Sequence, residues 1–235
     1  MKTVLLACKT IKAEIDHVLN ATGQGATGLK ATGQGDLPVV WIESGLHNTT
    51  DRLHLAMQEA LDRIERAENP DRVLLGFGFC GNAVLDLRTG DYTLVIPRVD
   101  DCITLLLGSF AVRKEISAEG GTYFLTPGWM GHESNIYAEY QYALDKYGKR
   151  LTDDIYREIL AHYENLGIID TGVYDFEAFV EQTKVVARTL GLRQRPIRGT
   201  LRYIERLLAG PWPDVEFVTV PKFAVVDQDM LDLSD

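Results

Sequence analysis

LLGFGFCGNAVLDL, residues 74–87, is the stretch on which the interpretation of this sequence depends. An apolar run leads to Cys80, two small residues follow, and a second apolar run begins. A short apolar run of this kind predicts a strand that is buried on both faces, as in a parallel sheet. Cys80 would then stand at the carboxyl end of that strand. A cysteine in such a place can be buried filler, a nucleophile or a metal ligand.

Further apolar runs predict strands that alternate with helices along the first half of the chain. The strands are expected at residues 2–8, 37–45, 72–79, 92–99 and 121–127, with a short late strand at 215–221. Apolar residues at helical spacing predict helices at 9–19, 46–67 and 100–116. Such alternation is typical of an α/β fold with helices on both faces of a parallel sheet. We therefore predict a doubly wound, mainly parallel, Rossmann-like sheet.

The second half of the chain has a different pattern. From about residue 129 to 209 the apolar periodicity is mostly helical, and the basic stretch at 193–206 is interpreted as the solvated side of a helix with its leading turn. This pattern predicts a largely helical C-terminal extension or cap. The expected parts are an α/β domain with a site at its strand ends (1–128), a helical cap or lobe (129–210), and a return strand with a tail (211–235).

Composition and charge narrow the classes of function. The 235 residues carry a formal net charge of −10, and no basic run provides the face that nucleic-acid binding needs. No apolar stretch reaches the ~18 residues that would indicate a membrane helix, and no signal-peptide pattern opens the chain. The three cysteines are an odd number, which fits reduced thiols better than a disulfide framework. We expect a cytoplasmic protein that binds neither nucleic acid nor membrane.

A glycine-rich stretch separates the first two expected strands. Residues 20–36 contain ATGQG twice. Glycine and small polar residues favour a flexible loop. A phosphate-binding loop fits less well, because the Gly-Lys-Ser/Thr ending of such loops is missing.

All three cysteines stand at or just after expected strand ends. Cys8 follows the first strand, Cys80 the third and Cys102 the fourth. His47 lies just past the second strand. Because ligands bind beyond the carboxyl ends of the strands in open parallel sheets, these side chains are expected to share one rim. Thiolates from separate strands can ligate zinc or an iron–sulfur cluster, with His47 as the candidate fourth ligand. Buried filler and a reactive thiol are the alternatives.

The same rim carries further polar candidates. Arg98 precedes two adjacent carboxylates, Asp100 and Asp101. They form either a helix cap with its ion pair, or a site in which Arg98 anchors an anionic substrate and an aspartate transfers protons. Asn82 and Trp129 are candidates for binding the cofactor. For Trp129, in the glycine-rich turn TPGWMGH, a packed tryptophan in a structural turn is the alternative.

These motifs together resemble an uncharacterised family, a domain of unknown function from anaerobic microbes whose genes often lie near those of corrinoid-dependent methyltransferases. The matching pieces are AC with Cys8, LHN with His47, GFGFCGNAV with Cys80, IPRVDDCITLLLGS with Cys102, GTYFLTPGW, IDTGVYD and GPW. They cover nearly the whole chain, and the glycine-rich stretch 21–36 is an insertion relative to the family pattern. Many members carry a PHC-like element where residues 100–102 stand. The resemblance implies a one-carbon context and groups the three cysteines with His47, and it supplies no reaction.

The sequence therefore predicts a cytoplasmic metalloprotein with a cysteine-ligated zinc or [4Fe–4S] site at the sheet rim. The resemblance implies a role in methyl-group or corrinoid-linked one-carbon metabolism, and a corrinoid cofactor is implied by it alone. The expected partners are a small-molecule substrate, or a methyltransferase or corrinoid protein. The alternative is a non-catalytic accessory protein that binds metal or cofactor for a methyltransferase system.

Overall fold

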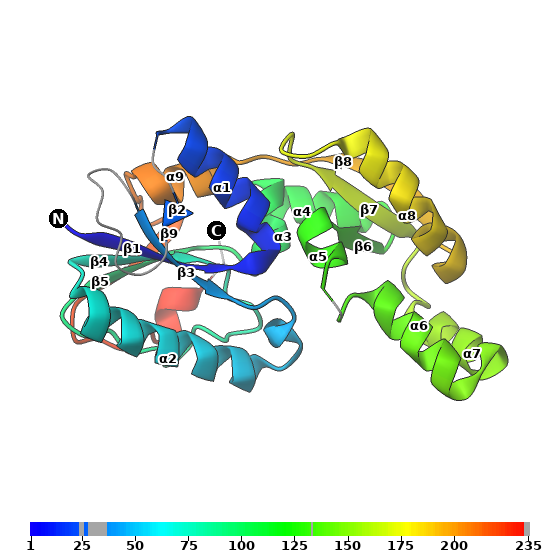
Figure 1. The fold of residues 1–235 in the computed structure, drawn as a ribbon, viewed down its shortest axis with the longest axis horizontal. Helices are drawn as coiled ribbons and strands as arrows, with labels where there is room; N and C mark the ends of the chain where they lie inside the picture. The colour runs from blue at the N-terminus through cyan, green and yellow to red at the C-terminus, as the bar shows by residue number, and fades with distance from the viewer. Residues whose placement is uncertain (24–25, 28–36, 133, 233–235) are drawn as a thin grey trace. The chain divides into compact units, whose positions relative to one another are not determined.

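The chain forms two compact units (Figure 1). The structure is a computed structural model that describes residues 1–23, 26–27, 37–132 and 134–232, except for the side chains of Ala26, Thr27 and His47. The first unit consists of residues 1–109 together with the chain from Leu201 onward, and the second unit consists of residues 110–200. The boundaries therefore differ from those expected at 128 and 210. The second unit is an insertion between two parts of the first.

The first unit is built on a six-stranded sheet in the order β2-β3-β1-β4-β5-β9. Its strands are β1 (Thr3–Cys8), β2 (Ala26–Thr27), β3 (Leu37–Ile42), β4 (Arg72–Gly76), β5 (Thr93–Pro97) and β9 (Phe217–Val220). All neighbouring strands are parallel except β9, which runs antiparallel to β5. The predicted α/β class with a mainly parallel sheet is confirmed, and the late strand does rejoin the sheet.

The central strands are apolar without interruption because both faces of the sheet are covered. In β1, Val4, Leu5, Leu6 and Ala7 are fully buried. Figure 1 shows α1 and α9 on one face of this sheet and α2 on the other. The helices of this unit are α1 (Lys12–Ala21), α2 (Thr50–Glu68), α3 (Cys102–Leu107) and α9 (Arg202–Ala209), with short 3-10 turns at Lys9–Ile11, Leu46–Asn48 and Asp229–Leu231.

Helix α2 supplies the core on its face of the sheet. Its predicted apolar stripe of Leu53, Met57, Leu61 and Ile64 is almost completely buried. These side chains pack with alternate residues of β1, and this set ends at Cys8. The alternation of β1 side chains thus places the Cys8 thiol at the edge of the α2-facing core.

The second unit has a sheet of its own, in the order β6-β7-β8, with all strands parallel. Its strands are β6 (Thr122–Leu125), β7 (Asn165–Asp170) and β8 (Arg193–Arg198). Its helices are α4 (Phe110–Ala118), α5 (Pro127–Met130), α6 (Ile136–Tyr147), α7 (Lys149–Ile159) and α8 (Phe176–Leu190). The expected strand at 121–127 therefore exists but belongs to this second sheet, and the segment 129–210 contains two strands besides its helices.

Strand β8 was interpreted as part of a helix because of its charged residues. RQRPIR is an edge strand with only Ile197 buried, so its apolar alternation is weak. Pro196 is compatible with an edge strand, where fewer backbone donors are needed. The predicted helix at 100–116 is in fact two helices, because Gly108 adopts a φ of 88° and caps α3.

Among the described residues, no helix is both long and apolar enough to cross a membrane. Of the glycine-rich stretch 21–36, only residues 21–23 and 26–27 are described, and the latter form β2 against β3. The loop predicted for the remaining residues of that stretch lies outside the described part of the chain.

Gly78 provides a test of the packing at the end of β4. A Cβ atom at this position would lie 2.6 Å from the Cα of Asp101, which is backbone and cannot rotate away. We expect Gly78→Ala to lower the free energy of unfolding by about 1–3 kcal/mol, the usual cost of overpacking. The measurement is urea unfolding followed by far-UV circular dichroism. Gly131→Ala is the control, because its nearest neighbour would be 3.4 Å away, and equal losses in both variants would contradict this account.

Candidate functional site

The topology of the first sheet marks one place on its rim as the natural ligand site. The chain runs from β1 to β3 on one side and then crosses to β4 on the other side of β1. In open parallel sheets, the crevice at such a reversal of direction is where ligands bind, outside the carboxyl ends of the strands. Cys8 is the last residue of β1, and Cys80 follows the end of β4 at Gly76. Two of the three cysteines therefore flank the reversal point.

The backbone after β4 is held against the backbone after β5. The amide of Phe79 donates to the carbonyl of Val99 at 2.8 Å, and the amide of Cys80 donates to the carbonyl of Asp100 at 2.7 Å. Gly78 makes this approach possible, because any side chain there would collide with the Asp101 backbone. The two loops thus continue the strand pairing beyond the strands and bring residue 80 next to residues 100–102.

Three consecutive residues at this point have left-handed backbone conformations. The φ angles are 48° for Cys80, 68° for Gly81 and 68° for Asn82. Glycine tolerates such a φ, whereas cysteine is strained by it and asparagine adopts it more readily than most residues. Strained backbone of this kind is concentrated at functional sites, where surrounding contacts fix it. The turn directs the chain across the rim in place of a helix.

The three cysteine thiols lie close enough to interact electrostatically. Burial raises the pKa of Cys80, and the neighbouring Cys8 raises it further. Burial also raises the pKa of Cys102 well above its ordinary value, with added contributions from Cys8 and Cys80. The pKa of the buried Cys8 is raised by desolvation as well, although a hydrogen bond with Thr10 opposes the shift. Their common role as metal ligands stays a prediction.

The surroundings of the thiols are acidic. Asp101 and Asp100 both raise the pKa of Cys80, and Glu43 raises that of Cys8. Asp101 also raises the pKa of Cys102. The largest cause in each case is desolvation, and the added negative charges act in the same direction. A thiolate formed here therefore needs a compensating positive charge.

A buried chain of hydrogen bonds extends from Cys8. The thiol of Cys8 donates to the hydroxyl of Thr10 across 3.3 Å, and this hydroxyl donates to that of Ser44 across 3.0 Å. All three residues are at least nine-tenths buried. Beside them, Lys9 forms an ion pair with Glu43. Thr10 could not be predicted from the sequence, because a threonine after a strand carries no recognisable signal of a site.

The structure gives Arg98 and Asp101 structural partners. Arg98 donates to the backbone carbonyls of Asp214, Met230 and Asp232 at 2.7–3.0 Å, and so ties the C-terminal segment to the end of β5. Asp101 caps α3 by accepting a hydrogen bond from the amide of Thr104 at 3.0 Å. The helix cap considered in the sequence is therefore present. Substrate anchoring by Arg98 and proton transfer by Asp100 or Asp101 remain predictions.

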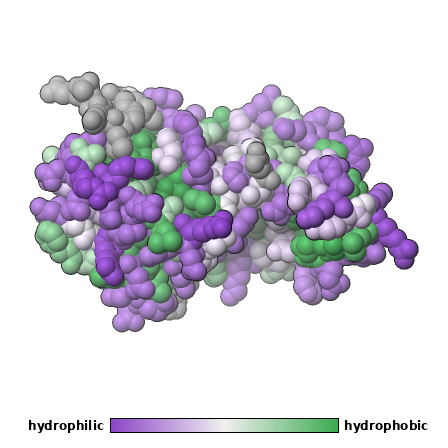
Figure 2. Space-filling model, turned by 60° about the horizontal axis from the view of Figure 1, so that its bottom comes forward, coloured by the Kyte–Doolittle hydropathy of each residue, from purple (hydrophilic) through white to green (hydrophobic). Residues whose placement is uncertain are grey.

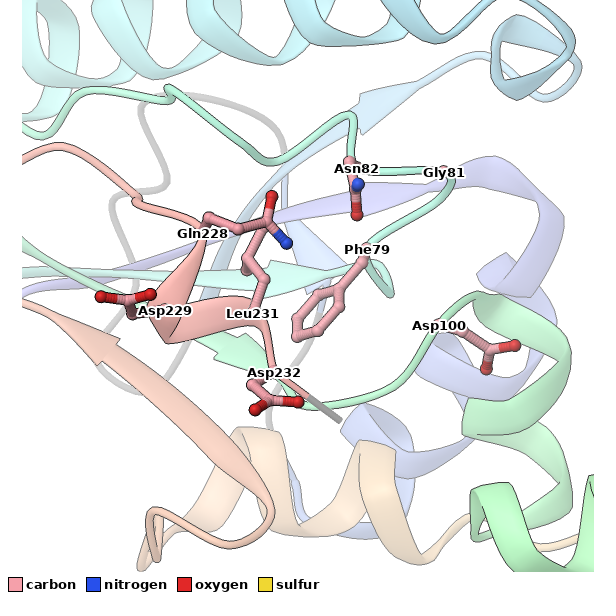
Figure 3. A pocket seen from close by; sticks show the side chains of 8 residues that line it. All are labelled: Phe79, Gly81, Asn82, Asp100, Gln228, Asp229, Leu231 and Asp232. Atoms are coloured by element: carbon pink, nitrogen blue, oxygen red, sulfur yellow. The ribbon is translucent and has the colours of Figure 1, made fainter. Parts of the chain in front are cut away.

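A pocket of about 700 Å³ lies beside Cys80, between the loop after β4 and the C-terminal segment (Figure 3). Asn82 and Gln228 extend from its opposite walls, and the Phe79 ring is directed toward Leu231. Two sequence candidates, Asn82 and Asp100, belong to its lining. The full lining is Phe79, Gly81, Asn82, Asp100, Gln228, Asp229, Leu231 and Asp232. The contribution of residues 228–232 was not predicted, because no motif marks a chain terminus that folds back over a rim.

No described contact links the two remaining candidates to this cluster. Trp129 belongs to the second unit, where its indole nitrogen donates to the hydroxyl of Tyr123 at 3.1 Å and its ring stacks on His132. These contacts match the alternative of a packed tryptophan in a structural turn, and its cofactor-binding role remains a prediction. His47 lies in the turn Leu46–Asn48, and its side chain is outside the described ones, so its role as a metal ligand remains a prediction.

The donor atoms at the rim suit a soft metal, since thiolates are the ligands preferred by zinc and iron–sulfur clusters. Their arrangement is a separate matter. In the described part of the chain, no group of three or more His, Cys, Asp or Glu side chains is arranged so that it could hold a metal ion. The three sulfurs share a neighbourhood without forming a ready set of ligands.

The fold defines an α/β protein in which Cys8 and Cys80 flank the reversal point of a mainly parallel sheet. Residues 41–208 match the family model described as protein of unknown function (DUF1638). The chain belongs to this family, and the matched residues include Cys80, Cys102 and the whole second unit. No curated protein and no solved structure is similar enough to the chain to count as a match.

The buried thiols predict a specific loss of stability in alkaline solution. Folding disfavours their thiolates, whereas unfolded thiols ionise from about pH 8.5 upward. The free energy of unfolding should therefore be unaffected below that pH and fall above it. For each thiol, the loss is up to about 1.4 kcal/mol for a rise of one pH unit. The pKa of Tyr92 is also raised by burial, but an ordinary tyrosine ionises only near pH 10, so its effect comes later.

The measurement is urea unfolding of reduced protein at pH 7.5 and 9.5 with a chelator present. The triple variant Cys8→Ser, Cys80→Ser, Cys102→Ser is the comparison, because serine does not ionise in this range. We expect the wild-type protein to lose stability between the two pH values and the triple variant to lose far less. Equal losses in the two proteins would show that the thiols ionise freely in the folded state.

Proposed function

We propose that this protein is a metalloprotein in which Cys8, Cys80 and Cys102 bind zinc or a [4Fe–4S] cluster at the sheet rim. His47 or a substrate takes the fourth position. The observation that carries the proposal is the gathering of all three cysteines of the chain, from three different strand ends, at one rim. Buried filler does not require cysteines from three strand ends to share one rim.

In this proposal, the three sulfurs move closer to one another when the metal binds. Each thiol releases its proton to the solvent when it binds, and the positive charge of the metal offsets the repulsion from Asp100 and Asp101. Three thiolates with an open position suit zinc that activates a thiol or a methyl acceptor. They equally suit a cluster with one iron that no cysteine binds. Because binding needs reduced thiols, a reducing compartment such as the cytoplasm is part of the proposal.

The pocket beside Cys80 is the proposed substrate site. Asn82 extends into it from the loop that carries Cys80, and Asp100 belongs to its lining. A substrate held there would be next to the open metal position, with the Asn82 amide as a hydrogen-bond partner. Methyl-group or corrinoid-linked one-carbon metabolism is proposed as the process. This assignment rests on the resemblance of the motifs around Cys8, His47, Cys80 and Cys102 to a family encoded near corrinoid-dependent methyltransferases.

The deciding experiment is elemental analysis of protein purified without oxygen, together with its absorption spectrum. A brown protein with broad visible absorption and about four irons per chain supports the cluster. A colourless protein with one zinc per chain supports the zinc site. Cys8→Ser, Cys80→Ser and Cys102→Ser should each lose most of the metal while far-UV dichroism stays native. A wild-type protein that binds neither metal, even after reconstitution, would refute the proposal.

His47 can be tested with a matched control. His47→Ala should weaken metal retention by roughly tens of fold, or change the cluster spectrum, if the imidazole binds the metal. His162→Ala is the control, because His162 is an exposed histidine in the second unit. Equal metal content and spectra in the two variants would leave three cysteines and an exchangeable fourth position.

Thr10 provides a test of the hydrogen bonds behind Cys8. When Cys8 binds metal as a thiolate, the Thr10 hydroxyl can reverse its direction and donate to the sulfur, supported by Ser44. Thr10→Val keeps the shape and removes this donor, so it should weaken Co²⁺ binding by about tenfold, measured from the thiolate-to-cobalt absorption. Thr10→Ser keeps the donor and should bind nearly as the wild type does. Weakening by the serine variant as large as by the valine variant would point to packing instead.

A further inference from the structure

The second unit exposes an ordered apolar ridge on α7. Leu151, Ile155 and Ile159 are 51%, 37% and 56% exposed, although each is a large aliphatic side chain. They stand four residues apart and so form one row along the helix. Figure 2 shows apolar surface gathered over the part of the molecule where α6 and α7 lie. A contiguous apolar patch of this kind marks an interaction surface more often than a chance exposure.

The opposite face of α7 already has its partners. Thr152 and Tyr156 are buried, and Tyr156 packs edge-to-face against Tyr140 of α6 with ring centroids 5.1 Å apart. The core of the second unit is therefore complete on the inner side of the helix. The ridge is additional apolar surface that the fold of this unit does not use.

The spacing of the exposed side chains is symmetric about Ile155. Leu151 and Ile159 lie four residues to either side of it on the same helix. In a two-fold interface the same patch is used by both copies, so that residue i contacts residue j and residue j contacts residue i. An antiparallel pairing of two α7 helices places Ile155 on the two-fold axis and Leu151 opposite Ile159 of the second copy. Rows of this i, i+4 type interdigitate at a crossing angle of about −50°.

The charges of this region also favour a second copy as the occupant. The chain has a net charge of −10, so two copies repel one another over most of their surfaces. Residues 142–163 are an exception, with four basic and four acidic side chains. Asp154 and Arg157 already form an ion pair within one helix, with nitrogen and oxygen 2.9 Å apart. In the antiparallel pairing, Arg150 lies near Glu158 of the second copy. The region is thus neutral and complementary to itself.

We propose that the α7 ridge is a self-association surface, through which two copies of this chain form a symmetric dimer about Ile155. The 11 residues of α7 make a short contact, about 16 Å long. An interface of this size is at the small end of specific interfaces, so the dimer dissociates on dilution. The proposal is independent of metal binding at the rim of the first unit.

The first experiment is sedimentation velocity of the full chain from about 1 to 200 μM, a range that brackets the micromolar affinities of small interfaces. We expect a shift from monomer to dimer over this range for the wild-type protein. Ile155→Glu should stay monomeric throughout. Val185→Glu is the control, because Val185 is 42% exposed on α8 and the added charge is the same. A wild-type monomer at every concentration, or an unchanged dimer in Ile155→Glu, would overturn the proposal.

A cross-linking experiment tests the symmetry itself. Ile155→Cys places a thiol on the two-fold axis, where it meets its own copy, and mild oxidation should give a covalent dimer on a non-reducing gel. Leu151→Cys should cross-link much less by itself, because it faces Ile159 of the second copy, and the double variant Leu151→Cys, Ile159→Cys should restore the product. Stronger cross-linking of Leu151→Cys than of Ile155→Cys would show a different geometry and overturn the assigned axis. Far-UV dichroism of each variant separates a lost interface from a lost fold.

Discussion

The close approach of two backbone segments past the strand ends determines the rest of the rim. Gly78 packs directly on the Asp101 backbone, and the amides of Phe79 and Cys80 donate to the carbonyls after β5. This contact sets where α3 begins, because Asp101 is its cap. It also brings the loop of Cys80 beside Cys102, the first residue of α3. The strained turn that follows Cys80 forms one wall of the pocket.

Electrostatics gives that rim its chemical character. Burial keeps the thiols protonated, and the nearby carboxylates reinforce the effect instead of opposing it. A site that only needed a nucleophilic thiolate would be expected to contain a basic neighbour that lowers the thiol pKa. Arg98, two residues before Asp100, donates to the carbonyls of Asp214 and Asp232.

Features that depend on a local sequence pattern could be predicted from the sequence alone. The buried strands of the first sheet have uninterrupted apolar runs, and the α2 stripe has helical spacing, so both were predictable. The grouping of the cysteines followed from the parallel topology alone. Strand β8 was missed because an edge strand with one buried residue has no alternation to detect. The wall formed by residues 228–232 and the Thr10 hydroxyl depend on long-range packing, which leaves no local signal.

The insertion of the second unit also affects how the chain can assemble. The first sheet is completed only when β9 pairs with β5, and residues 110–200 lie between α3 and α9. During synthesis, the second unit emerges whole before the last strand of the first unit exists. Closing an unstructured segment of that length would cost on the order of 4 kcal/mol in chain entropy. A second unit that is already folded shortens this segment, so the order of synthesis itself helps the first sheet to close.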